Sequence, residues 1–154
     1  MIEPLVKTIE VPCDQETAFD VFINDMESWW PLSRFTVSAM GGGVARGLRV
    51  EPRVGGTITE IGHDNAEHLW GTIRTYDPHD SVSMDFHIPQ PGEVVEARTL
   101  VEFRFTPTGD TSTRVELTQT NWEGLGEWAQ ALRGGYDGGW DAIFGEAYAA
   151  ACSR

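Results

Sequence analysis

Apolar and polar residues alternate in short runs through the second half of the chain, and this alternation is the strongest constraint on its fold. Val82, Met84 and Phe86 fall on one side of an extended run, and the same period of two recurs in residues 101–105 and 115–117. Side chains two apart in a strand point to the same face, so each run has one apolar and one polar face. This pattern predicts an antiparallel sheet that another element covers on one side.

Seven extended segments are predicted, one near the N-terminus and six in succession after residue 44. Short sequences rich in Asp, Asn, Pro and Gly separate most of the six and favour hairpin turns, whereas the two prolines in residues 89–96 predict a looser loop. The predicted strands are residues 5–11, 45–52, 55–62, 67–78, 80–88, 97–107 and 112–122.

Helical spacing occurs in two places. Residues 14–30 repeat apolar side chains three and four apart, and Asn24 and Asp25 favour two short helices there over one. Residues 134–154 predict a long C-terminal helix that covers the sheet, and residues 35–47 predict a glycine-rich loop without regular structure. The apolar face of the long helix consists of Tyr136, Trp140, Ile143, Phe144, Ala147 and Ala151. The predicted fold class is therefore α+β, in the order β-α-α-β6-α.

Two adjacent tryptophans, Trp29 and Trp30, end the first helical region before Pro31. Neighbouring residues of a helix point about 100° apart, so the two indoles are not expected to share a face. The apolar stripe predicts Trp30 in the interior and Trp29 at a partly exposed rim.

Composition and charge restrict the classes of partner. The chain has 154 residues, which predicts a single domain over residues 1–154. Eleven basic against twenty-four acidic residues give a net charge of −13, which disfavours nucleic acid and anionic membranes. No export signal or apolar run of membrane-spanning length is evident, so a cytoplasmic location with two free thiols, Cys13 and Cys152, is expected.

The sequence carries no motif for a cofactor or a metal. Its glycine-rich segments lack the spacing of phosphate-binding loops, so they are interpreted as turns and close packing. The four histidines form no HxH or HExxH pair. We therefore expect neither a cofactor nor a metal.

Glu60 is the candidate catalytic residue. It lies two positions after Ile58 on a predicted strand and therefore shares its face. If Ile58 points inward, a carboxylate lies inside an apolar cup, where it is paired, hydrogen-bonded or protonated and able to act as an acid or base. If Thr57, Thr59 and Ile61 point inward instead, Glu60 is in water. The local pattern leaves both interpretations open.

Large aromatic residues come from separate parts of the chain and are predicted to meet between sheet and helix. The covering helix also contains small residues, including Gly145 and Ala147, which favour a cavity over solid packing. The predicted ligand-binding residues are Trp30, Trp70, Phe86, Gln119, Trp122, Tyr136, Trp140 and Phe144.

Five motifs carry a resemblance to a known family. The chain resembles the activator homologues of the heat-shock-protein-90 ATPase, within the START-like (SRPBCC) superfamily that includes the birch pollen allergen. The motifs, in order, are ESWWPL, VEPRVGGTITE, LWGTI followed by YDP, TRVELTQTNW and GGYDGGWDAIF.

This resemblance implies a helix-grip fold, in which a curved antiparallel sheet wraps around a long C-terminal helix and leaves a hydrophobic cavity. Many relatives have histidine where this chain has Gln119, which hydrogen-bonds but does not shuttle protons. Single-domain relatives of this kind lack the separate N-terminal domain that helps to engage the chaperone.

The expected function is binding of a small hydrophobic, lipid-like or aromatic molecule in this cavity, by a ligand-binding protein rather than an enzyme. One alternative is a cyclase or hydratase type of enzyme that uses Glu60 there. Another is an interaction module that contacts a chaperone or a second copy through an exposed aromatic rim including Trp29 and Trp128. The chain is expected to be a monomer or a homodimer.

Overall fold

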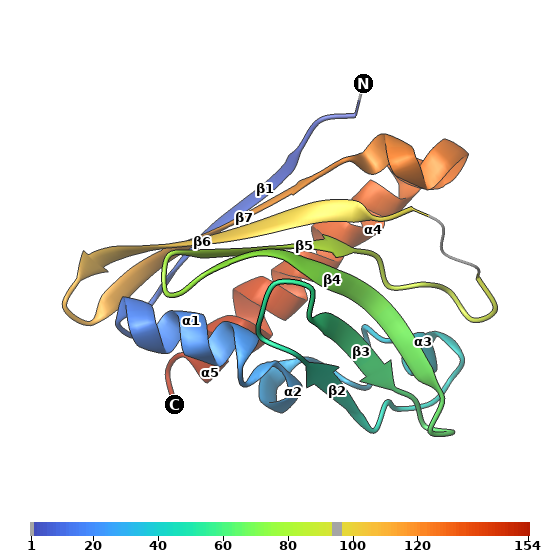
Figure 1. Ribbon diagram of the computed structural model, residues 1–154, viewed down its shortest axis with the longest axis horizontal. Helices are drawn as coiled ribbons and strands as arrows, with labels where there is room; N and C mark the ends of the chain where they lie inside the picture. The colour runs from blue at the N-terminus through green and yellow to red at the C-terminus, as the bar shows by residue number, and fades with distance from the viewer. Residues whose placement is uncertain (1, 94–96) are drawn as a thin grey trace.

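The computed structural model describes residues 2–93 and 97–154, and shows a seven-stranded sheet curled around a long C-terminal helix (Figure 1). The strand order is β1-β7-β6-β5-β4-β3-β2, and each neighbouring pair is antiparallel. The prediction of an α+β helix-grip fold is confirmed. Residues 94–96, part of the loop predicted at 89–96, lie outside the described residues. The strands are β1 (Leu5–Val11), β2 (Gly47–Val50), β3 (Thr57–Ile61), β4 (Glu67–Asp77), β5 (Ser81–Phe86), β6 (Thr99–Gly109) and β7 (Ser112–Thr120).

Helices occupy the connection between β1 and β2 and the C-terminal part of the chain. After β7 the backbone runs through a 3₁₀ segment into the long helix, which crosses the concave side of the sheet (Figure 1). The helical elements are α1 (Gln15–Ile23), α2 (Met26–Trp29), α3 (Val37–Met40), η1 (Trp122–Trp128), α4 (Ala129–Ala142), the π-helical η2 (Ile143–Tyr148) and α5 (Ala149–Ala151). Within residues 2–93 and 97–154, no helix has both the length and the hydropathy needed to cross a membrane.

One short helix lies where no regular structure is predicted. α3 forms a single turn within residues 35–47, and the side chain of Thr36 caps it by accepting from the backbone N–H of Ala39 at 3.0 Å. The Thr36 cap stabilises this single turn. A helix of four residues is too short to produce a recognisable hydrophobic pattern in the sequence.

The predicted alternation decides which face of the sheet is buried. Val82, Met84 and Phe86 of β5 are at most 3% exposed, as are the inward residues of β6 and β7. α4 and η2 supply the opposing surface, with Trp140 and Phe144 also buried. The core therefore lies between the concave face of the sheet and the C-terminal helix.

The prediction of a partly exposed Trp29 is wrong. Trp29 is 5% exposed and Trp30 is 4% exposed, and their ring centroids lie 5.8 Å apart. The helix breaks at Asn24, α2 is a single turn, and Trp30 already has extended backbone angles (φ −61°, ψ 133°). Because the two residues do not belong to one continuous helix, the 100° rule does not separate their side chains.

The π-helical turn η2 changes which residue of the C-terminal helix faces the core. The 3.6-residue period places Ala147 on the apolar face, but Tyr148 is fully buried there and Ala147 is half-buried. A π-helical turn contains an additional residue, so it shifts the face of every residue that follows. The Tyr148 hydroxyl then donates to the carbonyl of Ala18 in α1 at 2.7 Å.

Candidate functional site

A small pocket lies beside α4, and we call it the end pocket. Its volume is about 210 Å³, and its walls come from α4, the segment that follows β5, and the segment between α2 and β2. Small residues of α4, Ala131, Gly135 and Gly139, recur every four positions along the helical wall. The lining residues are Arg34, Phe35, Met40, His87, Ile88, Gln90, Ala131, Leu132, Gly135, Tyr136, Gly139 and Ile143.

Of the eight predicted ligand-binding residues, Tyr136 lines the end pocket. The structure places the other seven in the core, where each is at most 4% exposed: Trp30, Trp70, Phe86, Gln119, Trp122, Trp140 and Phe144. They do converge between sheet and helix as expected. The rings of Trp30, Trp70, Phe86 and Trp140 form one contiguous group, in which the centroids of Trp30 and Trp70 lie 4.9 Å apart. That these seven residues bind a ligand stays a prediction.

Gln119 connects the helix to the sheet. Its Oε1 accepts from the indole of Trp140 at 2.8 Å, and its Nε2 donates to the hydroxyl of Thr99 at 2.9 Å. Thr99 in turn donates to the carbonyl of Phe86 at 2.6 Å. The side chain at the position where many relatives carry histidine is therefore fully engaged in a buried network.

His87 and Tyr136 form a buried polar pair in the wall of the end pocket. The backbone N–H of Ile88 donates to the Tyr136 hydroxyl at 2.8 Å, and the same hydroxyl shares a hydrogen bond with Nδ1 of His87 at 3.0 Å. Nε2 of His87 then faces Oε2 of Glu93 at 3.3 Å. Burial lowers the pKa of His87, and the Glu93 carboxylate opposes this shift; burial also raises the pKa of Tyr136. Both lining groups are consequently neutral near pH 7.

No spacing rule in the sequence identifies this group. Its three members come from the residue after β5, from the loop that follows and from the middle of α4. The segment after β5 brings them together, and its path depends on tertiary packing. The signal available in the sequence is His87 itself, a histidine without an assigned role near the end of the predicted strand 80–88.

Glu60 points into the protein, which settles the two interpretations of its strand. Its side chain is fully buried, and both oxygens are engaged by donors. Oε1 accepts from Val37 N at 2.7 Å and Trp70 Nε1 at 3.2 Å; Oε2 accepts from Ser38 N at 2.9 Å and Ser38 Oγ at 2.8 Å. Four donors fill the acceptor positions of the carboxylate, and two of them are backbone N–H groups at the start of α3. The geometry indicates a structural role in holding α3 against the sheet.

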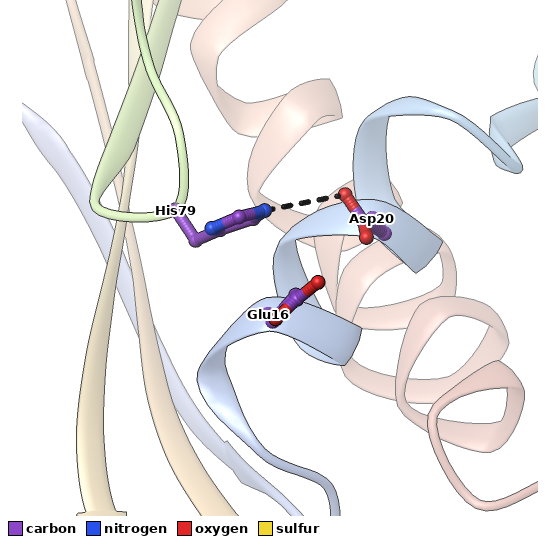
Figure 2. A group of neighbouring side chains, drawn as sticks. All are labelled: Glu16, Asp20 and His79. Carbon is purple, nitrogen blue, oxygen red and sulfur yellow. Dashed lines mark ion pairs between the residues drawn. The ribbon is translucent and has the colours of Figure 1, made fainter.

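A second titratable cluster lies on the surface between α1 and the turn after β4. Figure 2 shows His79 pointing from that turn toward Glu16 and Asp20 on α1. Nε2 of His79 lies 3.8 Å from Oδ1 of Asp20, and its ring packs edge-on against Phe19. Glu16 is exposed and the other two side chains are at least a third exposed, so we assign no ligand to this cluster.

The fold and the pocket define the class of protein to which the chain belongs. A curved sheet that grips a C-terminal helix, with a pocket against that helix, is the helix-grip architecture. Residues 13–147 match the family described as Activator of Hsp90 ATPase homolog 1-like protein, and the chain belongs to that family. No curated protein sequence matches the chain.

Solved structures with the same fold include proteins of different kinds. An anthrahydroquino-γ-pyrone synthase is 28% identical, with a TM-score of 0.61 and 88% of each chain covered. The self-sacrificing resistance protein CalC from Micromonospora echinospora is 23% identical, with a TM-score of 0.68, and the match covers 97% of this chain and 93% of that one. The Aha1 dimer from Colwellia psychrerythraea is 14% identical, with a TM-score of 0.59, 92% of this chain and 96% of that one being covered.

The role of Glu60 predicts a large loss of stability on substitution. Glu60→Gln replaces one oxygen with an amide nitrogen that faces donors, so we expect the unfolding free energy to fall by about 2–3 kcal/mol. Glu67→Gln is the matched control, since Glu67 forms an exposed pair with Arg49 whose loss changes the stability far less. Urea denaturation of both variants measures the difference, and equal stabilities would contradict this role.

The buried imidazole predicts a pH-dependent stability. The folded state disfavours protonation of His87, whereas the unfolded chain takes up the proton near the ordinary pKa of 6.5. The unfolding free energy should therefore fall as the pH is lowered from about 6.5 toward the lower pKa of the folded state. Denaturation at several pH values checks this, and His87→Asn should show a shallower fall over the same range. An unchanged slope in that variant would assign the dependence to other groups.

Proposed function

We propose that the protein binds a small, mainly apolar molecule of one or two rings in the end pocket. The observation that carries this proposal is the wall of α4, where Gly135 and Gly139 leave space beside Phe35, Ile88 and Ile143. A side-chain carbon built on Gly135 would meet no other atom within 4 Å. Ligand sites are commonly concave and lined mainly by apolar side chains, and the small residues of α4 leave such a concave space here.

The size of the pocket restricts the ligand. Pockets for drug-sized ligands commonly measure ~300–1,000 Å³, and the end pocket holds about 210 Å³. The interior beneath it is filled by the aromatic core, so a large sterol or lipid would require the core rings to move. A compact ring system fits without such a rearrangement.

An adjoining groove provides room for a substituent. This groove has a volume of about 560 Å³ and shares Gln90 and Leu132 with the end pocket. Its outer wall includes Trp128, which is 67% exposed. An indole in this position offers a flat apolar surface on which a ligand emerging from the pocket can stack.

The comparisons support a ring-containing ligand. The relative at 28% identity is named as the synthase of an anthrahydroquino-γ-pyrone, a compound of fused rings. Membership of the family is compatible with this function, because members of one fold differ in what they bind.

The alternative of an enzyme with Glu60 as its base has less support. The four donors around its carboxylate leave no acceptor position for a substrate proton. The alternative of a surface that contacts a chaperone or a second copy named Trp29 and Trp128 as exposed residues. Of these two, Trp128 is exposed and Trp29 is buried. Binding without turnover is therefore the function that the geometry supports best.

Filling the end pocket should abolish binding without unfolding the protein. Gly135→Leu places a side chain in the pocket and raises the helix propensity of α4, so we expect binding to weaken at least about tenfold while stability rises by up to about 1 kcal/mol. Prodan, a neutral fluorescent probe built on the two-ring naphthalene, measures the affinity when it is titrated into the protein, and thermal unfolding measures the stability.

Gly134→Leu is the matched control for this experiment. Gly134 is the preceding helical glycine, it also has open space around it, and it lies outside the pocket lining. The control should gain similar stability and keep wild-type affinity for the probe. Saturable binding that survives Gly135→Leu, or the absence of any binding to the wild type, would overturn the proposed function.

A further inference from the structure

The end pocket differs in charge from the rest of the molecule. The chain contains 24 acidic and 11 basic residues, yet none of the twelve residues that line the pocket is acidic. His87 and Tyr136 are engaged with each other, and burial keeps both neutral near pH 7. The formal charge in the pocket wall is therefore the single positive charge of Arg34.

Arg34 is held at the rim of the pocket. Arg34 lies in a turn that begins at Pro31. The carbonyl of Pro31 accepts from the backbone N–H groups of Arg34 and Phe35, both at 3.2 Å. Its guanidinium carbon lies 4.9 Å from the centre of the Phe35 ring, within the range of a cation–π contact. Phe35 also lines the pocket, so this contact keeps the positive charge beside the apolar space.

The guanidinium of Arg34 keeps its hydrogen-bonding capacity. Across residues 2–93 and 97–154, no carboxylate oxygen lies within 4.0 Å of it, whereas Arg49, Arg53, Arg74 and Arg104 each pair with an acidic side chain. Glu93, the acidic residue that contacts His87 of the pocket wall, also accepts from the backbone N–H of Gln90 at 2.8 Å. The planar fork of an arginine matches both oxygens of a carboxylate.

We infer that the ligand of the end pocket is a small ring-containing carboxylic acid. Its ring lies against α4 and Ile88, and its carboxylate binds the guanidinium of Arg34. This inference rests on the proposed function and specifies the chemical class of the ligand. The net charge of −13 repels anions in general, so a preference for an acid requires a local positive group such as this one.

Two probes of equal shape test the inference. Naphthoate and naphthamide, substituted at the same ring position, differ in charge and hardly in size. Calorimetric titration of the wild-type protein should give an affinity for naphthoate that is at least about fivefold higher, in keeping with a charged pair at a partly exposed site. Arg34→Gln should reduce naphthoate binding to the level of naphthamide and change naphthamide binding by less than about twofold.

Arg46→Gln is the matched control. Arg46 is also exposed, lies in the same connection between α2 and β2, and is outside the pocket lining, so its loss changes the net charge equally. This variant should keep the full preference for naphthoate. Equal losses in the two variants would indicate a general charge effect and overturn the inference.

The remaining outcomes separate the inference from the proposed function. If the wild type binds naphthamide as tightly as naphthoate, or if Arg34→Gln keeps the preference, the inference is wrong and the proposed function stands. If neither compound binds while prodan does, the inference is wrong and the proposed function stands; if prodan also fails to bind, the proposed function is wrong and the inference falls with it.

Discussion

A buried carboxylate holds the segment on which the pocket depends. Glu60, on a strand near the edge of the sheet, binds the first backbone N–H groups of α3, and this contact fixes the connection between α2 and β2 against the core. The same connection supplies Arg34, Phe35 and Met40 to the end pocket. A buried carboxyl group requires hydrogen-bond donors, and α3 supplies two of them, so Glu60 and this turn stabilise each other. The interaction accounts for a carboxyl side chain that is fully buried beneath α3.

The aromatic residues and the small residues of the C-terminal helix have separate functions. Below Tyr136, rings from the sheet, from α2 and from α4 fill the interior, and the rings of Phe144 and Tyr148 stack on each other within it. Interiors of proteins reach the density of organic crystals, and large rings reach it easily when they meet edge to face. Space is left where Ala131, Gly135 and Gly139 replace such rings on the helix. The position of the pocket therefore follows from side-chain size along one helix.

Periodicity predicts the elements of this fold better than it predicts their contacts. The six successive strands are evident because burial on one face imposes a period of two on each of them. The burial of Trp29 depends on a helix break that places both indoles inward, and the burial of Tyr148 depends on one π-helical turn. The inward direction of Glu60 is compatible with its strand but not required by it. The group of Tyr136, His87 and Glu93 depends on the path of a loop, for which local sequence holds no periodic signal.

Glycines in the middle of a helix are tolerated when other contacts fix the helix. Each costs about 1 kcal/mol of helix stability relative to alanine, so Gly135 and Gly139 together cost about 2 kcal/mol. On the opposite side of α4, about 200° around the axis from the small residues, Arg133 donates to the carbonyls of Glu3 and Pro4, and Asp137 and Asp141 bind Lys7 of β1. The indole of Trp140 adds the buried hydrogen bond to Gln119. Because these tertiary contacts hold the helix in place, the side of α4 that faces the pocket does not need bulky side chains for stability. Small residues can therefore leave space for a ligand beside a well-packed core.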